Sequence, residues 1–278
     1  MLQSPPATTT SAEPGVTPDF ELFRKRAYQI TGLDLTSYKA PQMHRRLMAL
    51  LSRLQVADFT AYARLLERDG ERRQEFRDYV TINVSEFFRD SDRFGDLERK
   101  ILPMLLESST AGVKVWSAGC SIGAEPYSMS IILRELAPAR THSILATDID
   151  QTILDRARGG RDYLASDIRN VGTGRMAKWF TPQPDGRYSV GAQPRTMITF
   201  QKHDLLRDRY PSGPFDLVSC RNVVIYFTEE AKERIYQGFV NSLRTGGILF
   251  VGGTEAIMRP QALGLKVVGP GFYRKEPV

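Results

Sequence analysis

Residues 112–126, GVKVWSAGCSIGAEP, combine residue types that bind ligands. The apolar stretch 113–117 predicts a short buried strand, and Gly119 and Gly123 follow it before an apolar helix. A strand, a glycine turn and a helix form the crevice in which α/β proteins bind nucleotides. The glycine spacing differs from the dinucleotide motif G-x-G-x-x-G, and no P-loop lysine follows. Since Glu125 would repel a phosphate at the start of the helix, the loop predicts a nucleotide-like ligand without phosphates.

Polar residues also follow the other predicted strands: Asp148 in ATDID, Asp204 in HDLL and Asn222 in CRNVVIYF. Ligands bind at the carboxyl ends of parallel strands, so we expect these residues around one site with Gly119. Asp148 is placed to accept hydrogen bonds from ribose hydroxyls, and Asp204 from an adenine amine. The alternatives are that Asp148 or Asp150 only caps the next helix, and that Asp204 opens a turn. Together, these residues predict a pocket for S-adenosylmethionine.

Two domains are predicted to carry this site, after a disordered tail over residues 1–18. Residues 19–85 have apolar residues at helical spacing between turn signals, which predicts a small all-helical domain. In residues 86–278, predicted strands alternate with predicted helices, which indicates an α/β fold with a mostly parallel, Rossmann-like sheet covered on both faces. Residues 180–200 interrupt this alternation with prolines and an Asp-Gly turn, so we expect a small antiparallel β insertion there.

The predicted strands and helices of the second domain follow one another closely along the sequence. The strands are expected at 113–117, 143–148, 215–220 and 247–252, and the helices at 124–136, 151–158 and 229–243.

Composition excludes several classes of protein. The chain has 278 residues and a net charge of +6, and no apolar run approaches the ~20 residues of a membrane span. Cys120 and Cys220 provide no disulfide framework, which favours a reducing cytoplasm, and no histidine lies at metal-ligand spacing to them. We therefore expect a cytoplasmic protein that binds no metal and does not insert into the membrane. The excess positive charge is spread along the chain, which argues against a nucleic-acid partner.

One segment is locally basic. In HRRLMALLSR, residues Arg45, Arg46 and Arg53 lie close together on a predicted helix. Two interpretations remain open: a solvated helix face, or a docking surface for an acidic partner.

Five motifs together resemble the CheR family of chemoreceptor glutamate O-methyltransferases. The motifs are NVSEFFRD (83–90), WSAGCSIGAEPYS (116–128), ATDID (146–150), HDLL (203–206) and CRNVVIYF (220–227). Their order and spacing match over roughly residues 19–278. The resemblance implies an S-adenosylmethionine-dependent enzyme that methylates glutamates in the cytoplasmic domain of methyl-accepting chemoreceptors. We also expect a monomer, although the sequence itself does not specify the oligomeric state.

The resemblance also implies the residues that contact the cofactor: Asn83, Ser85, Arg89, Glu125, Asp148, Asp204, Leu205, Asn222 and Val223. Two of them depart from the commonest family pattern. Ser85 stands where Thr is frequent and keeps the hydroxyl group. Asp204 stands where some members have Asn, which exchanges an amide for a carboxylate.

The expected reaction is methyl transfer to a glutamate carboxylate. Because a solvated glutamate has a pKa of ~4.3, the acceptor is already an anion and no general base is required. Arg89 and Tyr226 are the candidates for holding the acceptor, although Arg89 is also a candidate for holding the methionyl carboxylate of the cofactor. The alternative functions are methylation of another acceptor such as RNA, a non-catalytic adaptor that binds S-adenosylmethionine, and a nicotinamide oxidoreductase.

Overall fold

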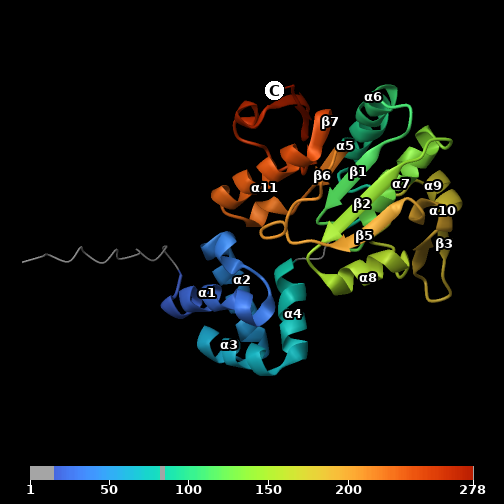
Figure 1. Cartoon of the computed structure of the whole chain (residues 1–278). Helices are drawn as coiled ribbons and strands as arrows, with labels where there is room; N and C mark the ends of the chain where they lie inside the picture. The colour runs from blue at the N-terminus through green and yellow to red at the C-terminus, as the bar shows by residue number, and fades with distance from the viewer. Residues whose placement is uncertain (1–15, 82–84, 278) are drawn as a thin grey trace, which may run out of the picture. The chain divides into compact units, whose positions relative to one another are not determined.

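The computed structural model describes residues 16–81 and 85–277 (Figure 1). Most of the tail predicted over residues 1–18 lies outside these residues, and Pro18 already begins the first helix. The chain forms two compact units. One comprises the chain up to Val80 together with Tyr226–Thr228, and the other comprises Thr81–Ile225 and Glu229–Val278.

The first unit is helical, as the sequence predicts. Its elements are α1 (Pro18–Thr31), η1 (Leu35–Ser37), α2 (Ala40–Leu54), α3 (Phe59–Arg68) and α4 (Gly70–Thr81), the last residue of which belongs to the second unit. The predicted turn signals end and begin these helices. Gly32 adopts a left-handed conformation at the end of α1, and the Asp58 side chain caps α3 by accepting a hydrogen bond from the Ala61 N–H. An aromatic cluster that includes Phe23, Tyr62 and Phe76 fills the centre of the unit.

The second unit is built on a seven-stranded sheet. Its strands are β1 (Lys114–Ala118), β2 (Ser143–Asp148), β5 (Ile198–Lys202), β6 (Phe215–Cys220), β7 (Leu243–Val251), β8 (Leu265–Gly269) and β9 (Phe272–Lys275). Its helical segments are α5 (Ser91–Asp96), η2 (Leu97–Ile101), α6 (Leu102–Glu107), α7 (Ala124–Leu136), α8 (Gln151–Gly159), α9 (Thr173–Trp179), α10 (Ala192–Arg195), η3 (Val224–Tyr226), α11 (Glu229–Ser242) and η4 (Pro260–Leu263). The last residue of η3, Tyr226, belongs to the first unit.

The strand order is β5-β2-β1-β6-β7-β9-β8, and the first five strands are parallel. The chain runs from β1 outward to β2 and β5, and from β6 outward to β7, so the direction of winding reverses between β1 and β6. Right-handed crossovers then place α7 and α11 on opposite faces of the sheet, as Figure 1 shows. This arrangement confirms the predicted Rossmann-like fold.

The antiparallel parts differ from the prediction in extent. The small two-stranded sheet consists of β3 (Phe180–Pro182) and β4 (Tyr188–Val190) and fills only the first part of the expected 180–200 insertion. Residues from Ile198 onward belong to β5, which pairs in parallel with β2. The pair β8 and β9 extends the main sheet beyond β7, where the sequence analysis had placed no strands. Within the two described stretches of chain, no helix combines the length and the apolar character needed to cross a membrane.

Candidate active site

Four loops follow the carboxyl ends of the adjacent strands β5, β2, β1 and β6. They carry the predicted residues Asp204, Asp148, Gly119 and Asn222. The winding of the sheet reverses between β1 and β6, and this is the point at which open α/β sheets bind their ligands. The structure therefore brings these four residues to one edge of the sheet.

The glycine loop requires its glycine at position 119. Gly119 has φ of 77°, and a Cβ atom there would lie 2.5 Å from Cγ2 of Val223. Only glycine therefore lets the loops after β1 and β6 approach this closely. The Thr147 carbonyl accepts hydrogen bonds from the Gly119 and Cys120 N–H groups, at 2.8 and 2.9 Å, and fixes the turn against β2.

Asp148 is buried and bonded to the backbone of two loops. Its Oδ2 accepts a hydrogen bond from the Ser121 N–H at 2.8 Å, and its Oδ1 accepts one from the Asp150 N–H at 3.1 Å. Burial raises the pKa of Asp148 to about 6. The helix cap is Asp150, whose Oδ1 accepts hydrogen bonds from the Thr152 and Ile153 N–H groups at the start of α8. The two acids of ATDID thus have separate roles.

Asp204 opens a turn, which was the alternative to an adenine contact. Its Oδ1 accepts a hydrogen bond from the Leu206 N–H at 2.8 Å. Burial raises the pKa of Asp204. In the same turn, the Leu205 carbonyl accepts a hydrogen bond from the Tyr210 hydroxyl at 2.8 Å. The turn uses one of the lone pairs of the Asp204 carboxylate, so an adenine contact can still be accepted beside this bond.

The loop that carries Asn222 and Val223 is held by a buried carboxylate. Glu255 accepts hydrogen bonds from the N–H groups of Gly252, Asn222, Val223 and Val224, at 2.6–3.1 Å. Burial raises the pKa of Glu255 despite these four bonds. Asn222 has φ of 60°, an uncommon conformation for a residue other than glycine, and these bonds hold it there.

Glu125 lies in the first turn of α7 and is half-enclosed by polar partners. Its Oε1 accepts a hydrogen bond from the Ser117 hydroxyl at 2.7 Å, and its Oε2 lies 3.4 Å from a guanidinium nitrogen of Arg221. The side chain of Arg221 is only 2% exposed. A buried cation therefore accompanies the carboxylate at the helix start.

The segment before α5 carries three predicted residues. Ser85 is half-buried and Arg89 lies between Phe88 and Asp90, both of which have positive φ, 52° and 57°. Asn83 lies outside the described residues. Phe88 is buried against Phe94, and its N–H donates a hydrogen bond to the Ser128 hydroxyl. This phenylalanine therefore contributes to the core of the second unit.

Tyr226 belongs by its contacts to the helical unit. Its carbonyl accepts a hydrogen bond from the Lys39 N–H at 3.0 Å, and Phe227 forms an antiparallel bridge with Tyr38. The tyrosine ring is half-buried. Residues 38 and 39, between η1 and α2, therefore fix the backbone of this candidate residue.

The three arginines of the basic segment differ in their surroundings. Arg46 donates hydrogen bonds to the carbonyls of Tyr79 and Val80 and lies over the Tyr79 ring. Arg53 pairs with Glu75 at 3.0 Å. Arg45 is exposed and makes no hydrogen bond or ion pair within the described part of the helical unit. Two of the three therefore hold α4 against α2.

The two cysteines lie at the strand ends and are both buried. Burial raises the pKa of each thiol well above its usual range, so both stay protonated at neutral pH. In the portions of the chain that the structure describes, no group of three or more His, Cys, Asp or Glu residues could hold a metal ion.

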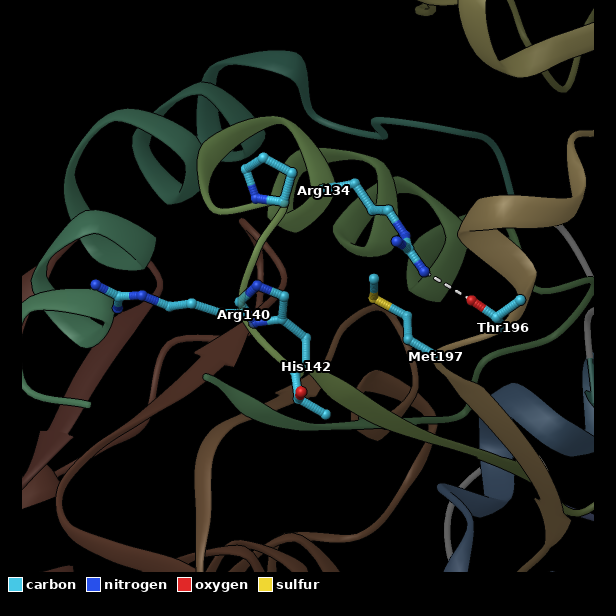
Figure 2. A pocket seen from close by; sticks show the side chains of 7 residues that line it. Arg134, Arg140, His142, Thr196 and Met197 are labelled. Carbon is cyan, nitrogen blue, oxygen red and sulfur yellow. Dashed lines mark hydrogen bonds between the residues drawn. The ribbon is translucent and has the colours of Figure 1, made fainter. Parts of the chain in front are cut away.

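A separate cavity of about 240 Å³ lies at the opposite, amino-terminal edge of the sheet. Figure 2 shows that the guanidinium groups of Arg134 and Arg140 point in opposite directions from it. His142 accepts a hydrogen bond from the Val113 N–H with Nδ1, and its Nε2 bonds the Ala137 carbonyl. The cationic groups around this cavity thus do not converge on one point.

Buried polar atoms at the carboxyl ends also indicate a ligand. The Asn222 Oδ1 and the Ser121 hydroxyl are buried and have no hydrogen-bond partner among the described residues. A buried polar atom without a partner is costly, so a polar ligand at this edge would stabilise both. The hydroxyl and amine groups of a nucleoside fit these atoms and the carboxylate of Asp148.

Comparison with known families identifies the chain. The family described as "CheR methyltransferase, SAM binding domain" matches residues 83–268, and "CheR methyltransferase, all-alpha domain" matches residues 18–81. This chain belongs to the CheR methyltransferase family. It is similar to proteins named chemotaxis protein methyltransferase from Listeria innocua and Borreliella burgdorferi. The first is 40% identical over 262 residues, which are 94% of this chain and 99% of the relative. The second is 33% identical over 262 residues, 90% and 92% of the two chains.

Family membership confirms the predicted resemblance and shows that the chain is a methyltransferase with an S-adenosylmethionine-binding domain. The sequence analysis missed two residues of the site, Arg221 and Glu255. A signal for both was present, because each is a charged residue directly or shortly after an apolar strand, in FDLVSCR and ILFVGGTE. Charged residues at such positions are rarely buried without a partner.

Proposed function

We propose that the chain transfers the methyl group of S-adenosylmethionine to glutamate side chains in the cytoplasmic domains of chemoreceptors, giving glutamate methyl esters and S-adenosylhomocysteine. Relatives named chemotaxis protein methyltransferase support this pathway. The observation that carries the proposal is the strand-end site, where Asp148 and Glu125 accompany buried polar atoms without partners. Such a site suits a nucleoside-like cofactor without phosphates.

In this proposal, each loop binds one part of the cofactor. Asp148 accepts hydrogen bonds from the ribose hydroxyls, and the turn at Asp204 and Leu205 binds the adenine. Glu125 lies beside the methionyl ammonium group. Although Arg221 is its neighbour, the Glu125 carboxylate can still bind this group because a carboxylate accepts several hydrogen bonds. The remaining contacts come from Asn83, Ser85, Gly119, Asn222 and Val223.

When bound, S-adenosylmethionine supplies a methyl group on a positively charged sulfur. The acceptor glutamate is already ionised, so no residue of the chain has to remove a proton. The chain has to hold the acceptor oxygen in line with the methyl carbon and to exclude water, because opposite charges disappear during the reaction. We assign the orientation of the acceptor carboxylate to Arg89 and Tyr226.

We further propose that the exposed face of α2 docks the receptor. Arg45 is the arginine of that face without an intramolecular ion pair or hydrogen bond among the residues described, whereas Arg46 and Arg53 also stabilise the helical unit. An exposed cation contributes mainly to the rate of association with an acidic partner. All three stay candidates for docking, and Arg45 gives the cleanest test.

The reaction is tested with methyl-labelled cofactor and two acceptors, receptor cytoplasmic fragments and total RNA. We expect label on the receptor that alkali releases, as it does from methyl esters, and none on a fragment whose candidate glutamates are alanine. Label on RNA would show another acceptor. Binding of S-adenosylhomocysteine without any transfer would indicate an adaptor.

The docking surface is tested with Arg45→Ala and a matched control, Arg64→Ala, an exposed arginine on α3. We expect Arg45→Ala to raise the KM for the receptor fragment by about fivefold at low salt, with unchanged affinity for S-adenosylhomocysteine. The difference should vanish near 1 M salt, where the Debye length is ~3 Å. Equal KM values for both variants would indicate that Arg45 lies on a solvated helix face and does not dock the receptor.

A further inference from the structure

Arg221 is a buried arginine that bonds two different segments of the site. Its guanidinium group lies over the rings of Phe94 and Phe250, at 5.2 and 4.7 Å from their centroids. Its Nη2 donates two hydrogen bonds, one to Asp90 Oδ2 at 2.6 Å and one to the Arg89 carbonyl at 2.9 Å. The other terminal nitrogen lies 3.4 Å from Glu125 Oε2. One side chain therefore joins the start of α7 to the segment that carries Arg89.

That segment adopts a backbone conformation that needs support. Phe88 and Asp90, on either side of Arg89, both lie in the left-handed region, where residues other than glycine are strained. Asp90 precedes α5 but makes no side-chain hydrogen bond to cap it, and its carboxylate bonds Arg221 instead. Arg221 is therefore a principal contact that keeps the Arg89 backbone in this conformation.

The charges of this cluster favour an additional cation. The Arg221 guanidinium group accompanies two carboxylates, those of Glu125 and Asp90, so these three side chains together carry one negative charge in excess. Asp90 is 43% exposed and partly solvated, whereas Glu125 is 13% exposed. A cationic group of a ligand beside Glu125 would balance the cluster and reduce the repulsion between the two carboxylates.

We propose that Arg221 is a positioning residue that couples cofactor binding at Glu125 to the conformation of residues 88–90. The inference rests on the proposed placement of the cofactor ammonium group beside Glu125. When that group binds, Glu125 and Arg221 are fixed against each other, and Arg221 in turn fixes Asp90 and the Arg89 carbonyl. The position of the Arg89 side chain thereby depends on whether the cofactor is present.

Amide hydrogen exchange tests this coupling without an acceptor. In the wild-type chain, we expect saturating S-adenosylhomocysteine to slow exchange of the amides in 86–94 by about tenfold or more. Arg221→Lys keeps the positive charge, but an ammonium group is a point charge without the planar fork that reaches both segments. We therefore expect Arg221→Lys to lose most of the protection on adding S-adenosylhomocysteine, and to lower kcat more than it raises the KM for the receptor.

Arg244→Lys is the matched control. Arg244 pairs with the buried Asp216 at the amino-terminal edge of the same sheet, so the same chemical change is made away from the site. Cofactor-dependent protection of 86–94 should stay intact in this variant. If Arg221→Lys retains the protection as fully as Arg244→Lys does, Arg221 has only a structural role and the inference is wrong.

Asp90→Asn changes the contact of Arg221 with Asp90 and leaves its contact with Glu125 in place. This variant tests the inference if Arg221→Lys does not fold. It should weaken the protection of 86–94 and lower kcat about tenfold, with S-adenosylhomocysteine affinity within a few-fold of wild type. Unchanged protection and kcat would contradict the inference. A wild-type chain that shows the coupling but methylates no receptor would leave the inference intact and refute the proposed acceptor.

Discussion

Both ends of the parallel strands gather charged side chains, yet the backbone groups that these side chains bond differ between the two ends. At the carboxyl ends, the carboxylates of Asp148 and Glu255 accept hydrogen bonds from backbone N–H groups. At the amino ends, Arg140 donates to the carbonyls of Leu106 and Ser109, and His142 bonds the Ala137 carbonyl. Acids hold these loops at the first edge and basic residues hold those at the second, although Arg221 bonds the Arg89 carbonyl at the first edge and Asp216 accepts from the Lys114 N–H at the second.

Helix direction accounts for one side of this difference. At the amino-terminal edge, the Leu106 and Ala137 carbonyls lie at the ends of α6 and α7, where the last carbonyls of a helix need donors from outside it. At the carboxyl-terminal edge, the N–H groups that Asp148 and Glu255 bond belong to the loops after the strands. The buried atoms without partners also differ in kind. Among the described residues, Asn222 Oδ1 and Ser121 Oγ at the first edge are oxygen atoms on neighbouring loops, whereas Arg134 Nε at the second edge belongs to a guanidinium group that points away from that of Arg140 in Figure 2. A cavity among diverging cationic groups is therefore weaker support for a ligand site than unpartnered oxygen atoms on neighbouring loops.

The largest effect is expected for Glu255→Ala, which removes the acceptor of four backbone N–H groups. Because these groups lie in a buried loop, we expect the free energy of unfolding to fall by about 3–5 kcal/mol. Urea unfolding measures this loss, and S-adenosylhomocysteine affinity should fall with it. Glu230→Ala, at an exposed position of α11, is the control and should change stability by less than about 0.5 kcal/mol. A loss below about 1 kcal/mol for Glu255→Ala would show that water replaces the carboxylate.

Arg89→Lys distinguishes the two roles proposed for Arg89. If Arg89 orients the acceptor, turnover should fall by about 100-fold with S-adenosylhomocysteine affinity within a few-fold, because misplacing a reactant by ~1 Å can cost that much. If Arg89 holds the methionyl carboxylate, affinity itself should fall by about tenfold, as expected for one charge-assisted hydrogen bond. Calorimetry and steady-state kinetics separate the two patterns.

Tyr226→Phe is the companion variant for the acceptor-orienting role. It removes one hydroxyl group and should lower turnover more mildly than Arg89→Lys, with unchanged cofactor affinity. Full activity in both variants would contradict both assignments and leave the family membership unaffected.

Much of the fold could be predicted because local signals agree with the tertiary structure. The apolar stretch FDLVSC forms the fully buried central strand β6, and Gly32 and Asp58 end and begin helices where the sequence indicates. The β8–β9 pair could not be predicted in the same way. Residues 265–269 alternate weakly, and their pairing with β9 depends on a partner strand that is itself set by β7.

The site residues could be predicted by type and only partly by role. Asp148 and Asp150 follow one another in ATDID, and both could cap a helix; only the geometry shows that Asp150 does so. Arg221 and Glu255 were missed because their partners lie 96 and 33 residues away in the chain. Contacts between loops of different strands depend on the strand order, which periodicity does not specify.

A pH titration tests whether the carboxylate of Asp148 binds the cofactor. Burial raises the pKa of Asp148 to about 6, so the group takes up a proton as the pH falls through 6. Ribose hydroxyls bond the ionised form, so S-adenosylhomocysteine affinity should be constant above about pH 7. It should fall below pH 6, by at most about tenfold per pH unit for one proton.

Two variants assign that pH dependence. Asp148→Asn should remove it, together with at least about tenfold of the affinity. Burial also raises the pKa of Asp204, so Asp204→Asn is required as the second variant and should leave the dependence in place. A dependence that persists in Asp148→Asn would assign it to another group.

The smallest effect is expected at the amino-terminal edge, for Arg134→Ala. Arg134 donates a hydrogen bond to the Thr196 hydroxyl at 2.7 Å, and its Nε is buried without a partner in the described part of the chain. If the cavity in Figure 2 bound an anion, the Arg134 guanidinium group would be expected to bind it, because Arg134 lines the cavity and its Nε has no partner among the described residues. The comparison of the two edges predicts that the cavity binds no anion.

Arg134→Ala should therefore lower the free energy of unfolding by about 1 kcal/mol or less and change S-adenosylhomocysteine affinity and kcat by less than about twofold. Inorganic phosphate, compared with chloride at equal ionic strength, should raise the melting temperature of wild type and variant equally. A phosphate-dependent stabilisation that Arg134→Ala abolishes would show a second ligand site at this edge, and diverging cationic groups would then no longer argue against a site.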